Sequence, residues 1–221
     1  MDTPLFRDRS DAGRKLAQAL PDLRAHNPFV MAVTRGGVPV AVEVARALQA
    51  PLDLVIVRRI VVAEHPDRTI GAVLDADEPD AFLDEDLVKT LGIPPQSIED
   101  EIVRQRQVIA FQQNLYASGR PRLGVRRRAV ILVDDLIATG ATIRVAIRAM
   151  YEASASPVIV AAPVVAAPVA EAVKAACDDL IALAIVPDAA EAARCYADFH
   201  PVSDSEVIRL MHAMPASFLS D

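Results

Sequence analysis

The sequence predicts an α/β protein with a doubly wound, mainly parallel sheet, helices on both faces and an insertion. Short unbroken apolar runs, typical of strands buried on both faces, alternate with segments of helical periodicity. Two of these runs end in glycine-bearing turns, at residues 34–37 and 134–142, and each turn opens a helix. With 221 residues and a hydrophobic share of 52%, the chain is long enough for one such domain with an insertion.

The first part of the chain predicts two helices and two strands. Arg9–Ala25 has the apolar spacing of an amphipathic helix, and Pro28–Val33 is a buried strand. The turn Thr34–Gly37 follows this strand and leads into a second helix. Leu52–Arg58 is the next apolar run and predicts a second strand.

Between Arg59 and Arg128 the alternation of strands and helices stops, which indicates an insertion. It is expected to hold a short strand at Ile70–Leu74, an acidic loop at Asp75–Asp86, a long helix at Ser97–Ala117 and a helix stop at Gly119–Pro121. Ser97 and Asp100 have the spacing of a capping box, which would place the start of the long helix at Ser97.

The last part of the chain begins with the buried strand Ala129–Val133, followed by Asp134 and Asp135. The turn Ala138–Thr142 then opens an amphipathic helix. The remaining predicted elements are a strand at Pro157–Val164, a helix at Val169–Cys177, a strand at Leu180–Ile185, and helices at Ala189–Arg194 and Asp204–His212, with Ser203 capping the last.

The turn after Asp135 has the residues of a phosphate site. A helix start offers free backbone N–H groups and the positive end of the helix dipole. Thr139 and Thr142 add hydroxyl donors, and Gly140 lets the backbone approach a ligand closely. Two carboxylates beside such a turn suit a sugar phosphate, because they accept hydrogen bonds from vicinal hydroxyls. The alternative is an ordinary strand–turn–helix corner with solvated acids.

Arg35, Gly36 and Gly37 form a second candidate anion site. Adjacent glycines permit close approach of the backbone to a ligand, and the guanidinium of Arg35 supplies a fixed positive charge. Taken alone, the same residues are equally compatible with a tight turn. The neighbouring acidic motif favours the anion site.

Composition disfavours several classes of protein. A formal net charge of −7, a sequence pI of about 5.1 and an aromatic share of 4% argue against a nucleic-acid-binding protein. The two cysteines, Cys177 and Cys195, form no Cys-x-x-Cys pair, and the four histidines show no metal-ligand spacing. No signal peptide or membrane-spanning run is visible, so a cytoplasmic location is expected.

The motif Val133–Thr142 resembles the phosphoribosyl pyrophosphate motif of type I phosphoribosyltransferases. Within that family the chain is most similar to a bacterial branch with a helical hood. The segments that carry this wider resemblance are Thr34–Gly37, His65–Asp67, Gly119–Pro121, Asp134–Asp135, Tyr196–Phe199 and Asp204–Val207. They cover nearly the whole chain, which the resemblance therefore interprets as one domain, residues 1–221, with a hood or flap at about 60–125.

The resemblance implies transfer of ribose 5-phosphate from phosphoribosyl pyrophosphate to an unassigned small acceptor, such as a nucleobase, with release of pyrophosphate. Asp134 and Asp135 would hold the ribose hydroxyls. The 5-phosphate would bind the turn formed by Ala138, Thr139, Gly140, Ala141 and Thr142. Mg²⁺ would arrive on the substrate, with the two carboxylates acting on it through water. A homodimer is also expected from the family.

Pyrophosphate would bind Arg35, Gly36 and Gly37, and Arg59 is a further candidate cation there, although an arginine at a strand end is commonly just solvated. Ala138 stands where enzymes for 6-oxopurines carry an aspartate, so such an acceptor is disfavoured. If a general base is needed, the nearest candidates are Glu64, His65 and Asp67.

Two other functions remain open on the sequence. One is a non-catalytic regulatory protein that senses phosphoribosyl pyrophosphate or a nucleotide. The other is a hydrolase of the same fold, which would admit water in place of the acceptor.

Overall fold

The computed structural model describes residues 4–21, 23, 27–74, 81–117 and 124–215. The helices are α1 (Arg9–Ala19), α2 (Gly37–Leu48), α3 (Glu85–Leu91), α4 (Pro95–Ala117), α5 (Ala141–Glu152), α6 (Ala167–Ala176), α7 (Ala189–Arg194) and α8 (Asp204–His212). The strands are β1 (Phe29–Val33), β2 (Leu52–Val55), β3 (Val57–Ile60), β4 (Gly71–Leu74), β5 (Ala81–Leu83), β6 (Val130–Val133), β7 (Leu136–Ile137), β8 (Val158–Ala166) and β9 (Asp179–Val186).

The central sheet is parallel throughout. Its strands follow the order β2, β1, β6, β8, while β9 pairs with β8 and the short β7 continues the line of β6 along β8. Every residue of β1, β6 and β8 is buried, as expected for strands covered on both faces. The predicted α/β class with a doubly wound parallel sheet is therefore confirmed.

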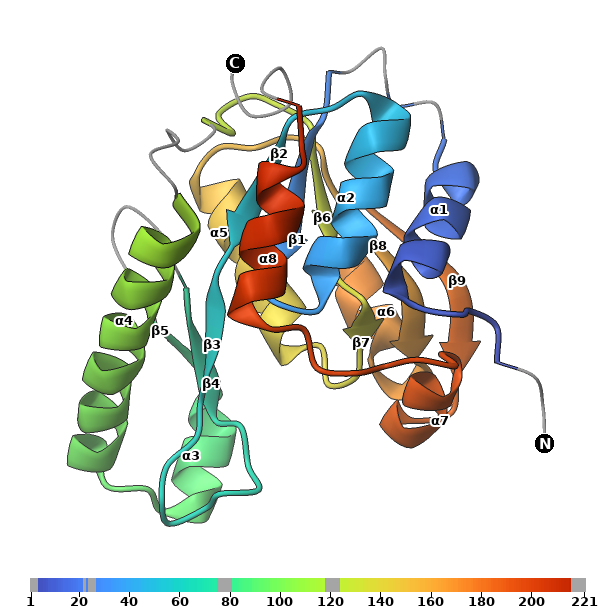
Figure 1. Cartoon of the computed structure of the whole chain (residues 1–221). Helices are drawn as coiled ribbons and strands as arrows, with labels where there is room; N and C mark the ends of the chain where they lie inside the picture. Colours follow the sequence, from blue (N-terminus) through green and yellow to red (C-terminus); the bar gives the residue numbers. More distant parts are fainter. Residues whose placement is uncertain (1–3, 22, 24–26, 75–80, 118–123, 216–221) are drawn as a thin grey trace.

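Helices cover both faces of the sheet (Figure 1). On one face, α1, α2 and α8 share a buried apolar cluster with inward side chains of β1 and β6. On the other face, α5 and α6 enclose a second cluster, which includes Ile143 and Ile147. A third, small cluster around Phe6 and Tyr196 lies where the chain segment before α1 meets the segment after α7.

The hood is a separate antiparallel sheet of β3, β4 and β5 with α3 and α4, and it projects to one side of the central sheet in Figure 1. The predicted strand Leu52–Arg58 is in fact two strands that meet at Ile56 and belong to different sheets. Because no glycine, proline or other turn residue interrupts the apolar stretch Leu54–Val57, the sequence gives no sign of this change of sheet.

Among the helix ends that differ from the prediction are those of α1 and of the long helix α4. Helix α1 ends at Ala19, because Leu20 precedes Pro21 and adopts an extended backbone. The long helix begins at Pro95, so Ser97 lies inside its first turn and is not the predicted cap; its hydroxyl donates to Glu64 instead, at 2.6 Å. The predicted helix stop Gly119–Pro121 lies outside the described residues.

The prediction of a loop at Asp75–Asp86 is wrong for the second half of that segment. Residues 81–83 form β5, and Asp84 caps α3 by accepting the Leu87 N–H at 3.0 Å. Residues 75–80 lie outside the described residues. The bounds of α7 and α8 agree with the prediction, and Ser203 accepts the Glu206 N–H at 3.2 Å as the expected cap.

Leu16 tests how strongly α1 depends on its packing. Its side chain is 0% exposed in the cluster under α1 and α2, so Leu16→Ala should lower the free energy of unfolding by about 2–5 kcal/mol in a urea titration. Leu5→Ala removes the same atoms from a side chain that is 51% exposed and should change stability by less than about 0.5 kcal/mol. Equal losses in the two variants would contradict this packing.

Candidate functional site

The carboxyl ends of β1 and β6 place the two predicted loops side by side. The strands pair in parallel, with Ala32 opposite Val133, so their following loops leave the same edge of the sheet. A Cβ added to Gly37 would lie 2.5 Å from the Val133 carbonyl oxygen, far inside a normal contact. The loop Thr34–Gly37 thus rests directly on the backbone that leads to Asp134.

A cavity of about 200 Å³ opens at this edge, and it gathers one carboxylate, one cation and the glycine turn. Its lining residues are Arg59, Asp134, Leu136, Ile137, Ala138, Thr139, Gly140, Thr142 and Ile143. Drug-sized ligands usually occupy about 300 Å³ or more, so this cavity suits a smaller molecule, such as a sugar phosphate. Arg59 reaches this cavity from β3 of the hood, so both the central sheet and the insertion contribute residues to the cavity.

The turn after β7 has the geometry of an anion site. Gly140 has φ +71, a left-handed conformation that glycine adopts without a steric penalty, and it caps the start of α5. Thr139 Oγ1 accepts the Ala141 N–H at 3.4 Å. The first N–H groups of α5 point out of the helix and, with the helix dipole, favour a phosphate.

Asp134 is the carboxylate of the pair that faces the cavity. Its side chain is half-buried, and its Oδ1 accepts the backbone N–H of Asp135 at 2.9 Å. Burial and the adjacent negative charge of Asp135 raise the pKa of Asp134 well above its usual range, although Arg9 counters part of this effect.

Asp135 is not among the described residues that line the cavity, although its carboxylate lies within hydrogen-bonding reach of that of Asp134. Its side chain is 8% exposed, and its Oδ2 accepts the Nε–H of Arg9 at 2.6 Å. The same carboxylate lies against Gly36, where an added Cβ would come 2.4 Å from Oδ2. The sequence therefore predicted a pair whose members occupy two different environments.

Arg35, Gly36 and Gly37 are not among the described residues that line this cavity. The peptide bond between Thr34 and Arg35 is cis, and the guanidinium of Arg35 is exposed, with Nη1 3.3 Å from Asp204 Oδ1 at the start of α8. The Tyr116 hydroxyl on α4 also donates to Asp204. Asp204 therefore connects the loop Thr34–Gly37 to the hood helix α4. The sequence alone did not predict this connection.

Arg58 and Arg59 have different roles although they are neighbours. Arg58 is half-buried and its Nε donates to Gln105 Oε1 of α4 at 2.9 Å. Burial and the nearby charges of Arg35, Arg104 and Arg59 lower the pKa of Arg58. Arg58 thus anchors the hood helix, whereas Arg59 is the cation that reaches the cavity.

Of the candidate bases, Glu64 is already engaged by a hydrogen bond. The hydroxyl of Ser97 donates to its carboxylate, and this hydrogen bond lowers the pKa of Glu64. A lowered pKa makes a carboxylate a weaker base. His65 is half-buried and Asp67 is exposed in the turn after β3.

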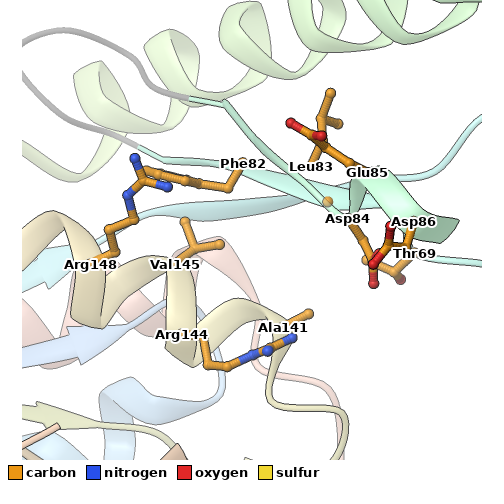
Figure 2. A pocket seen from close by; sticks show the side chains of 11 residues that line it. Thr69, Phe82, Leu83, Asp84, Glu85, Asp86, Ala141, Arg144, Val145 and Arg148 are labelled. Carbon is orange, nitrogen blue, oxygen red and sulfur yellow. The ribbon is translucent and has the colours of Figure 1, made fainter. Parts of the chain in front are cut away.

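A second cavity, of about 590 Å³, lies between α5 and the hood (Figure 2). Arg148 lies over the Phe82 ring, 4.4 Å from its centroid, while Asp84 and Asp86 lie on the hood side. Ala141 is the one residue of the predicted site among the described residues lining this cavity. This cavity is lined by acidic residues of the hood and by Arg144 and Arg148 of α5, so its charge does not indicate one class of ligand.

Among the described residues, no group of three or more His, Cys, Asp or Glu side chains is arranged to hold a metal ion. Within the same described part, no helix is both long and apolar enough to cross a membrane.

The fold and the site define an α/β protein with a small polar cavity at the carboxyl edge of a parallel sheet. A family model described as phosphoribosyl transferase domain matches residues 82–194, which is 113 of the 221 residues. The chain belongs to this family, and the family resemblance seen in the sequence is confirmed.

Two kinds of relative support the assignment. A curated protein with the provisional name phosphoribosyl transferase, recorded for two strains of Mycobacterium tuberculosis, is 34% identical over 209 residues. The match covers 94% of this chain and 46% of that protein, so the chain spans about half the length of the curated relatives it matches. The crystal structure of TT1426 from Thermus thermophilus is 35% identical, with a TM-score of 0.78, and the match covers 93% of this chain and 97% of that one.

Gly37→Ala tests the contact between the two loops. Because its Cβ would meet backbone atoms of Val133 that cannot rotate away, the variant should lose about 1–3 kcal/mol of stability in urea unfolding. Gly124→Ala is the matched control, since nothing lies within 4 Å of its Cβ position. A Gly37→Ala protein as stable as the control would show that the loops are not in contact.

Proposed function

We propose that this protein is a phosphoribosyltransferase that moves ribose 5-phosphate from phosphoribosyl pyrophosphate to a small acceptor. The observation that carries the proposal is the cavity in which Asp134, Arg59 and the Gly140 turn meet. Family membership supports the same reaction class. The acceptor is not assigned.

The substrate fits this cavity in one orientation. The 5-phosphate binds the turn at the start of α5, where backbone N–H groups and threonine hydroxyls converge. The ribose hydroxyls then donate hydrogen bonds to Asp134, and the diphosphate extends toward Arg59 and the loop Arg35–Gly37. Each charged part of the substrate meets a group of complementary charge.

The reaction breaks the bond between C1 of ribose and the diphosphate oxygen, and that oxygen keeps the electron pair. The acceptor lone pair forms the new bond to C1 and the acceptor gives up its proton. Positive charge grows on the ribose ring as the bond breaks, so the carboxylate of Asp134 stabilises the transition state more than the ground state. The hood excludes water from the activated carbon.

Magnesium fits this arrangement as a partner of the substrate. Mg²⁺ is commonly bound by phosphate oxygens, water and one or two carboxylates, and it neutralises charge that develops on a diphosphate. Asp134 is the cavity carboxylate that would contact such an ion through water. The chain's own residues orient the sugar, hold the phosphate and supply the arginines.

Asp134→Asn should weaken the binding of phosphoribosyl pyrophosphate with magnesium by about 1.5–3 kcal/mol, because charged hydrogen bonds to the sugar are lost. Titration calorimetry measures the change. Asp179→Asn is the control, since Asp179 starts β9 at the opposite edge of the sheet and is exposed. No binding by folded wild-type protein would refute the donor assignment. Binding without pyrophosphate release, across a panel of acceptors, would favour the sensing function.

The raised pKa of Asp134 gives the binding a predicted dependence on pH. Ribose hydroxyls donate to the charged carboxylate, so affinity is full above the raised pKa and falls by about tenfold per pH unit below it. This decline should begin at a higher pH than an ordinary aspartate would give. Calorimetry over a pH series measures this decline in affinity. Asp134→Asn is the control: the ligand's phosphates still titrate in that variant, but the decline caused by Asp134 should be absent.

A further inference from the structure

Asp135 is enclosed by two chain segments that are far apart in sequence. Residues before α1 pair with residues after α7: the Phe6 N–H donates to the Cys195 carbonyl at 2.9 Å, and the Ala197 N–H donates to the Phe6 carbonyl at 2.8 Å. The pairing brings Arg9 and Tyr196 to Asp135, two residues after the end of β6.

Arg9 is a buried cation with three partners. Besides the 2.6 Å bond from Nε to Asp135, its Nη1 donates to the His200 carbonyl at 2.7 Å, and the guanidinium lies 4.0 Å above the Phe199 ring. Arg9 is 8% exposed, as is Asp135. Both ends of the ion pair are therefore withdrawn from water and directed by other contacts.

A second contact holds the backbone of Asp135. The Tyr196 hydroxyl donates to the Asp135 carbonyl oxygen at 2.6 Å. The Tyr196 ring packs 4.7 Å from Phe199 and 5.2 Å from Phe6, so the hydroxyl has little freedom to move. Asp135 is consequently held at its carboxylate by Arg9 and at its carbonyl by Tyr196.

A buried ion pair of this kind is weak support for stability, because removing two charges from water costs about as much as their attraction returns. Its clearer consequence is geometric. The carboxylate of Asp135 lies between Arg9 and Gly36, and its own N–H donates to Asp134 Oδ1. One residue thus touches the pyrophosphate loop and orients the neighbouring carboxylate.

We propose that the two acidic residues divide the work: Asp134 contacts the ribose, whereas Asp135 is a positioning residue that Arg9 and Tyr196 hold in place. The proposal rests on the proposed function, since it assigns roles within the same substrate site. Arg9 acts on Asp135 by neutralising its charge and fixing the position of its carboxylate.

The first test compares Asp134→Asn with Asp135→Asn by calorimetric titration with phosphoribosyl pyrophosphate and magnesium. Asparagine at position 135 keeps an oxygen that can accept from Arg9 and keeps the backbone contact with Tyr196. Asp135→Asn should therefore weaken binding at least about tenfold less than Asp134→Asn does. Equal losses would show that Asp135 also contacts the substrate, and would overturn the division of roles.

The second test is a rescue. Arg9→Met leaves the buried carboxylate without a counterion and should weaken binding by about tenfold or more. Adding Asp135→Asn removes the charge that Arg9 neutralises, so the double variant should recover to within about threefold of Asp135→Asn alone. Arg7→Met, the same change at a side chain that is 76% exposed, is the matched control and should bind as wild type does.

Each result has a separate meaning. A double variant no better than Arg9→Met would show that Arg9 acts by another route and would overturn the proposal. If Arg9→Met fails to fold, which urea unfolding reveals, the comparison of the two asparagine variants still decides it. Wild-type protein that does not bind the substrate refutes the proposed function itself, before any variant is compared.

Discussion

The contact between the loop after β1 and the backbone after β6 is the constraint on which the site depends. Neighbouring parallel strands bring the loops to one edge, but they approach as closely as they do only because residue 37 has no side chain. This contact fixes the distance between the anion loop and the cavity that Asp134 lines. The rest of the fold supports that spacing: α2 and α5 start at these loops, and each is anchored in the apolar cluster on its own face.

The hood completes the site in a different way. It contributes Arg59 to the cavity and anchors its long helix through Arg58 and Gln105. Asp204 then ties the same helix, through Tyr116, to Arg35. Arg35 and Arg59 are therefore both connected to the hood, one through Asp204 and the other by its place in β3. A change in the position of the hood would therefore change the positions of both Arg35 and Arg59.

The sequence predicted β1, β6, β8 and β9 of the central sheet to within two residues, because each is a short run of mostly apolar residues. It also predicted the turn that lines the cavity, because Thr139, Gly140 and Thr142 lie within four positions of one another in the sequence. It failed where structure depends on distant partners. The run Leu52–Arg58 gives no sign that its two halves join different sheets. The sequence also provided no reason to distinguish Arg9 from the exposed arginines near it. Arg9 is buried because residues 196–200, which are distant in sequence, pack against it.

The pairing of the segments around Phe6 and Tyr196 has a consequence for the order in which the protein matures. A ribosome makes the acidic motif well before Tyr196, which lies 61 positions after Asp135. A nascent chain that ends at α5 contains β1, β6 and the glycine turn, but it lacks β8, β9 and Tyr196. The surroundings of Asp135 are thus complete only after most of the chain has been made.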